Sequence, residues 1–231
     1  MNITPPKSNL IGLHARTIEA YLCTFMGYEA LYSSEDFITS LSDSFLEDVC
    51  PEALDLPGAL VIWEEEETSL VSIHLRKDIF QTLDESSIDA SFLSTQEGLS
   101  AFLILTEEIS HFQYYTRHAA SDTPVSRFEM ELQAEIEKLI VGCLLLSQSF
   151  GRSHVKQLTQ KVFNESAIHG SMTDYRLASK MAENFWKQHL HALGDSIISD
   201  SSFRRLLQEI SRKTGQEKQR LLKNEILKSA A

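Results

Sequence analysis

Four side chains in the middle of the chain have the types and the spacing from which a metal site can be built. Glu107 and His111 are four residues apart, and so are Glu131 and Glu135. Residues four apart lie on the same face of an α-helix, so each pair would present its donor atoms on one side. One imidazole nitrogen with up to three carboxylate oxygens suits Zn, Fe or Mn better than a soft metal. An open position on such an ion would activate water or bind dioxygen.

Two long helices must hold these pairs. The pattern predicts helices over residues 95–118 and 127–150, which a short polar connection joins. Ser94 and Ser126 each precede a glutamate by three residues, which is the spacing of a capping box at a helix start. A connection this short makes the two helices antiparallel neighbours. We therefore expect a helical hairpin with the candidate site between its two arms.

The heights of the candidate ligands follow from the fold-back. A turn centred near Asp122 brings residue 111 level with about residue 133. Because an α-helix rises about 1.5 Å per residue, His111, Glu131 and Glu135 would lie within one helical turn of each other. The predicted site is thus formed by Glu131 and Glu135 on one helix and by His111 with its neighbouring glutamates on the other.

The segment Glu108–His111 has the ExxH pattern found in ferritin-like carboxylate proteins. Those proteins carry two such pairs, whereas this chain has one, so a complete di-iron site is not predicted. Whether Glu107 or Glu108 faces the site depends on the roll of the first helix about its axis, which leaves both open.

Two other interpretations of the same charges remain. In the first, they form an ordinary network of ion pairs, with Glu107 on Lys138 and Glu131 on Arg127. Such pairs contribute only about 0–1 kcal/mol when they are exposed. In the second, crowded carboxylates beside a histidine shift a pKa and support acid–base chemistry without a metal.

The rest of the chain predicts an α+β fold that is mostly α. Residues 1–90 read as a small unit of helices, including one over 34–49, with a β-hairpin at about 59–76. His74 would lie on the exposed face of that hairpin. Residues 91–231 read as a helical bundle, against which the first unit packs. Within the bundle we expect a short helix over 154–163, a loop, and further helices over 171–193, 203–213 and 216–228.

Composition limits the classes of function. The 231 residues carry a net charge of −12, which disfavours nucleic acid or an anionic membrane as the main partner. No apolar run reaches the roughly 20 residues that a membrane helix needs. The three cysteines are widely spaced and no signal peptide is evident, so we expect a cytoplasmic protein with reduced thiols. Without a P-loop or a GxGxxG motif, no nucleotide cofactor is expected.

Charge is distributed unevenly along the chain. Residues 201–231 hold eight Lys/Arg and three Glu, a net charge of +5 that leaves −17 on the other 200 residues. Two functions are therefore predicted from the sequence. The first is a metal-binding helical protein, a metal-dependent hydrolase or oxidase. The alternative is a non-enzymatic interaction or adaptor protein that binds another protein through its basic C-terminal helices.

Overall fold

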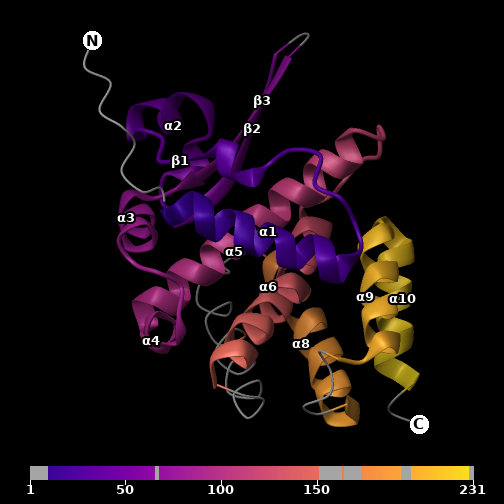
Figure 1. Cartoon of the computed structure of the whole chain (residues 1–231). Coiled ribbons are helices and arrows are strands. Elements are labelled where there is room, and N and C mark those ends of the chain that lie inside the picture. The colour runs from indigo at the N-terminus through magenta and orange to yellow at the C-terminus, as the bar shows by residue number, and fades with distance from the viewer. Residues whose placement is uncertain (1–9, 66–67, 151–162, 164–172, 194–198, 229–231) are drawn as a thin grey trace.

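The structure, a computed structural model, confirms a mostly helical fold with one small sheet (Figure 1). It describes residues 10–65, 68–150, 163, 173–193 and 199–228. None of the helices in these residues combines the length and the hydropathy that crossing a membrane requires. The short helix expected over 154–163 and the loop after it lie outside the described residues, apart from Phe163.

The N-terminal part is less helical than the sequence pattern predicts. Its elements are α1 (Leu10–Met26), η1 (Ser34–Phe37), β1 (Ile38–Thr39), α2 (Asp43–Val49) and η2 (Pro51–Ala53). The single helix predicted over 34–49 is therefore wrong. The β-branched pair of β1 joins a neighbouring strand in parallel, and the Ser42 side chain then accepts the N–H of Phe45 to begin α2.

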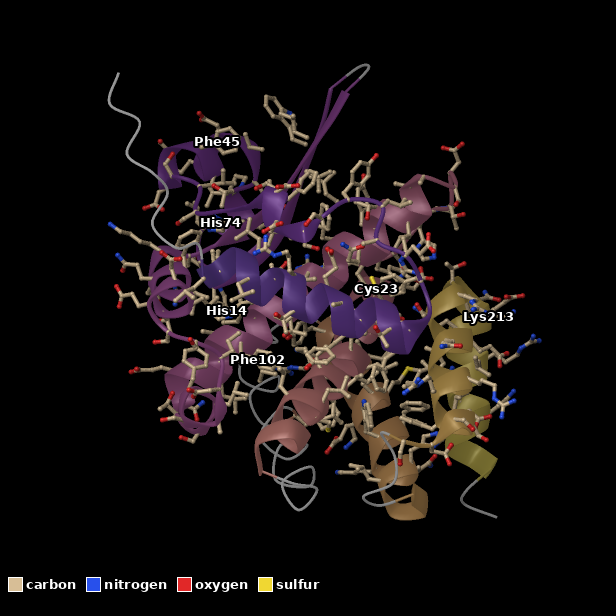
Figure 2. The ribbon with its side chains drawn as sticks, in the orientation of Figure 1. His14, Cys23, Phe45, His74, Phe102 and Lys213 are labelled. Carbon is tan, nitrogen blue, oxygen red and sulfur yellow. The ribbon has the colours of Figure 1, made fainter. Side chains whose placement is uncertain are left out.

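The β-hairpin is confirmed. It consists of β2 (Gly58–Glu65) and β3 (Thr68–Leu75), which pair antiparallel with Gly58 opposite Leu75. The strand order β1-β3-β2 places β2 at an edge of the sheet. The prediction that His74 is exposed is wrong, because the chain after β1 passes over its side chain. His74 is 3% exposed, its Nδ1 accepts the Leu41 N–H at 3.1 Å, and it lies between α2 and the start of α1 in Figure 2.

The remaining helices form the bundle. They are α3 (Lys77–Glu85), α4 (Ala90–Ser94), α5 (Gln96–Ala119), α6 (Arg127–Phe150), α8 (Thr173–Leu193), α9 (Ser201–Arg212) and α10 (Gly215–Lys228). The α5–α6 hairpin is present as predicted. Its second cap is a capping box: Ser126 Oγ accepts the Glu129 N–H at 3.3 Å, and Glu129 accepts the Ser126 N–H at 2.9 Å. The first cap is Thr95 rather than Ser94, which ends α4.

Helix α5 is the centre of the molecule and is buried along most of its circumference. Helix α1, helix α3 and the sheet cover one side of α5, and α6 covers the other (Figure 1). One continuous apolar core runs from Ile11 in α1 to Leu222 in α10. The polar side chains of α5 are consequently held in fixed positions between packed elements. The boundary proposed near residue 90 stays a prediction.

The C-terminal helices dock on the end of the α5–α6 hairpin. Tyr114 donates its hydroxyl to the Lys213 carbonyl at 3.3 Å, and Glu129 accepts the Gly215 N–H. Lys218 of α10 is fully buried, and its Nζ donates to Gln133 Oε1 at 2.7 Å. The same ammonium lies 4.1 Å from the centre of the Tyr114 ring, which is within range of a cation–π contact. A lysine therefore anchors α10 inside the bundle.

Because Lys218 is buried, we expect the unfolding free energy of the protein to change with pH between neutral and alkaline values. Burial lowers the pKa of Lys218 to about 7; the carboxylates of Glu137 and Glu129 oppose this shift, and Arg117 adds to it. An unfolded lysine titrates near pH ~10.4, so the unfolded chain binds more protons between these two values. The unfolding free energy of the wild type, measured against Lys218→Met, should therefore rise with pH, by about 1.4 kcal/mol per pH unit.

Urea unfolding of both proteins at neutral and alkaline pH measures this difference. Tyr114 and His118 also face Lys218, but they are present in both proteins, so their titration cancels in the comparison. Parallel pH profiles for the two proteins would show that Lys218 keeps an ordinary pKa in the folded state.

Candidate metal centre

The candidate site lies where α5 and α6 meet the beginning of β2. A cavity of about 310 Å³ opens there. Its walls come from four places in the chain: the segment from η2 into β2, then α5, α6 and α8. The residues that line it are Cys50, Glu52, Ala53, Leu56, Pro57, Gly58, Ala59, Leu60, Ile104, Glu107, Glu108, His111, Arg127, Met130, Glu131 and Tyr175.

Three of the predicted ligands come together at this cavity. Glu107, His111 and Glu131 each offer one ligand atom, and these atoms all lie within 4.8 Å of one another. His111 Nε2 lies 3.6 Å from Glu131 Oε2. Two donors that each bind one ion at about 2.1 Å in tetrahedral geometry are separated by about 3.4 Å. The spacing therefore fits a shared cation, so a possible metal-ligand group exists in this helical fold.

The two closest ligand atoms have no hydrogen-bond partner among the described residues. His111 Nε2 and Glu131 Oε2 are both buried and make no hydrogen bond within 3.5 Å; their nearest charged partners are each other, 3.6 Å apart. Buried polar atoms are almost always satisfied, so an unpartnered pair facing one cavity needs an explanation. A bound cation would satisfy both atoms at once.

Glu108 lies behind the imidazole rather than in front of it. Its Oε2 is 3.4 Å from His111 Nδ1, the ring nitrogen on the other side from Glu131. A carboxylate that holds a proton on one ring nitrogen leaves the other nitrogen free to bind a cation. The roll of α5 thus gives its two adjacent glutamates different positions: Glu107 is in the three-residue group, and Glu108 orients the histidine.

Electrostatics in this cluster favours charged forms of His111 and Glu107. Burial alone would lower the pKa of His111, but the carboxylates of Glu131 and Glu108 raise it well above its usual range. Burial would also raise the pKa of Glu107, but Lys138 and His111 outweigh it and lower that pKa. For Glu108, burial dominates and the pKa is raised. The carboxylates around His111 therefore favour a positive charge at its imidazole.

Glu135, the fourth predicted ligand, lies outside this three-residue group and shares the ammonium of Lys138 with Glu107. Lys138 is 2% exposed, and its Nζ donates to Glu135 Oε1 at 2.7 Å and to Glu107 Oε2 at 2.8 Å. Burial alone would lower the pKa of Lys138, but the two carboxylates raise it well above its usual range. Glu107 also accepts the Tyr175 hydroxyl at 3.2 Å. The ion pair between Glu107 and Lys138 is confirmed, and it places an ammonium between Glu107 and Glu135.

Other parts of the site differ in how far the sequence predicts them. The expected pair of Glu131 with Arg127 is present, with Arg127 Nε 3.8 Å from Glu131 Oε1. Tyr175 reaches the cavity from α8, which packs on α6. The wall formed by residues 50–60 was not predicted from the sequence, because those residues lie far from α5 along the chain and only the folded structure brings them to it.

Comparison of the chain with protein-family models, with curated proteins and with solved structures finds no match. The geometry around His111 is thus the observation from which a function must follow.

Proposed function

We propose that the protein binds one divalent metal ion through Glu107, His111 and Glu131 and uses it to hydrolyse a substrate in the adjoining cavity. The observation that carries this proposal is the pair of buried, unpartnered atoms, His111 Nε2 and Glu131 Oε2, 3.6 Å apart at the cavity wall. Two carboxylates with one neutral imidazole balance the charge of a divalent ion. Oxygen and nitrogen donors in this proportion suit Zn, Mn or Fe(II).

Each neighbouring side chain has a defined part in this proposal. Glu108 keeps the His111 ring oriented, and Lys138 fixes the Glu107 carboxylate while it holds Glu135 away from the ion. Tyr175, which lines the cavity, donates its hydroxyl to Glu107 and so helps to hold that carboxylate. The bound ion supplies a polarised water and a Lewis acid when it is present. Hydrolysis is preferred to oxidation because it needs no reactant besides the substrate and water.

Metal analysis tests the proposal. Protein purified without an affinity tag or a chelator should contain close to one equivalent of Zn, Mn or Fe. After treatment with a chelator, addition of ZnCl₂ or MnCl₂ should raise the unfolding free energy, by about 2.7 kcal/mol when free metal is 100-fold above Kd. Protein that retains no metal, and whose unfolding is unchanged by both salts, would rule the centre out.

Binding of another protein through residues 201–231 stays a prediction. Two of the cations in this segment are used within the fold: Lys218 is buried, and Arg204 lies 4.5 Å from the centre of the Phe25 ring. Others, including Arg205 and Arg212, are exposed on the surface. Any partner would therefore contact the outer faces of α9 and α10.

A further inference from the structure

Strand β2 has one side without a neighbouring strand. In the described residues the sheet order is β1-β3-β2, so β2 pairs only with β3. Its first three residues, Gly58, Ala59 and Leu60, line the same cavity as His111 and Glu131. An edge strand with free backbone groups is a template on which another extended chain can pair.

The register shows which backbone groups of β2 are free. The Arg76 N–H donates to the Pro57 carbonyl at 3.0 Å, which marks that pair as hydrogen-bonded. Hydrogen-bonded and non-hydrogen-bonded pairs alternate along an antiparallel ladder. The N–H and C=O groups of Gly58, Leu60 and Ile62 therefore point away from β3, toward the free edge.

This edge passes close to the turn of α5 that carries the candidate ligands. A Cβ atom on Gly58 would lie 2.7 Å from Ile104 Cγ2 and 3.0 Å from Glu108 Cγ, so the backbone of β2 rests directly on α5. Glu108 in turn contacts the His111 ring. Gly58 is buried against α5, so a chain would pair at Leu60 and Ile62, and Leu60 lines the cavity that holds His111.

We propose that the substrate is an extended polypeptide that pairs with the free edge of β2 and thereby brings one of its peptide bonds to Glu107, His111 and Glu131. This inference rests on the proposed function and adds the substrate class. Backbone hydrogen bonds to Leu60 would position the chain, and Leu56 and Met130 would contact its side chains. In the reaction, water adds to the carbonyl carbon and the C–N bond breaks. The leaving nitrogen takes both protons of the water, which gives a carboxylate and an ammonium group.

The charge of the cavity favours a peptide over a phosphate ester. Its described lining includes the carboxyl groups of Glu52, Glu107, Glu108 and Glu131, against the single guanidinium of Arg127. A phosphodiester or a nucleotide would bring further negative charge to this surface, whereas a peptide backbone is neutral. With Glu107 and Glu131 balanced by the proposed ion, Glu52 and Glu108 remain against Arg127, so apart from the ion the described lining offers a phosphate no excess of positive charge.

One substitution tests the edge directly. Leu60→Pro removes an N–H that points to the free edge without removing a hydrogen bond between β2 and β3, and proline is tolerated at such positions. Leu60→Ala is the matched control, because it loses the same side chain and keeps the N–H. We expect both variants to bind Zn²⁺ like the wild type. On a pool of short peptides from a digested proteome, analysed by mass spectrometry, Leu60→Pro should cleave at least about tenfold more slowly than Leu60→Ala.

A second measurement does not depend on the folding of a variant. One cleaved peptide is resynthesised with N-methyl groups on alternate residues, in the two possible phases. Methylation of the amides that face β2 should abolish cleavage by the wild-type protein. Methylation of the alternate amides, which face away from β2, should leave cleavage unchanged.

The outcomes separate the two proposals. Wild-type protein that binds no metal overturns the proposed function and this inference together. Protein that binds Zn²⁺ and hydrolyses p-nitrophenyl acetate but cleaves no peptide overturns the inference alone. Equal cleavage by Leu60→Pro and Leu60→Ala, or equal cleavage of the two N-methylated peptides, also overturns pairing with β2.

Discussion

Replacing His111 by alanine should weaken the binding of Zn²⁺ or Mn²⁺ by at least about 100-fold, more than the loss of an outer-shell partner costs. His111 supplies the single nitrogen in the three-residue group, and its Nε2 has no other partner among the described residues. The fold should survive, because the gap left by the ring opens into the cavity. Water can then hydrate Glu108 and Glu131, so we expect a loss of stability below about 2 kcal/mol.

Titration calorimetry with ZnCl₂ on chelator-treated protein measures this effect. The matched control is His118→Ala. His118 lies on the same helix and is also buried, but its Nδ1 contacts the Tyr114 carbonyl at 2.7 Å, away from the cavity. The control should bind zinc with the wild-type Kd. Equal Zn²⁺ affinities for His111→Ala and the wild type would show that the imidazole is not a metal ligand.

The second large effect is on stability. Lys138→Met should lower the unfolding free energy by about 3–5 kcal/mol, the usual cost of removing one partner from a buried ion pair. Two carboxylates depend on this ammonium, Glu135 at 2.7 Å and Glu107 at 2.8 Å, and methionine leaves both without it. Urea unfolding of chelator-treated protein at neutral pH measures the loss.

Two comparisons show whether the charge is responsible. Adding Glu135→Gln to Lys138→Met should recover part of the loss, because one buried charge is then neutral. Lys218→Met is the second comparison, since Lys218 is equally buried but donates to the neutral amide of Gln133. At neutral pH, Lys218→Met should lower the unfolding free energy much less than Lys138→Met does. If the two methionine variants lose the same stability, the carboxylates around Lys138 are not what makes that lysine important.

The part of the site that depends on helix geometry was predictable. The rise of a helix and the position of the turn are local properties, so the level of His111 opposite Glu131 follows from counting residues. The Glu107–Lys138 ion pair follows in the same way. The roll of α5 was not predictable, because it is set by the sheet and by α1, which pack on that helix from distant parts of the chain.

The errors share one physical cause. Residues 34–49 have helical periodicity, but Ile38 and Thr39 gain more by pairing with β3, about 35 residues away. The segment that follows this strand reaches His74, which is buried and accepts the Leu41 N–H. Glu135 as a ligand stays a prediction; in the structure its carboxylate pairs with Lys138, three residues further along the helix. Contacts between distant segments decide the positions of β1 and His74.

The ammonium of Lys138 also bears on whether the protein can fold before it binds a metal ion. Because a covalently attached cation already neutralises carboxylates between α5 and α6, the chain carries its own counter-charge from synthesis onward. Small zinc domains, in contrast, are unfolded until their metal arrives. Under the proposed function, folding and metal loading would therefore be separate steps. A cell poor in metal would accumulate an inactive but intact protein, which later metal could activate without refolding.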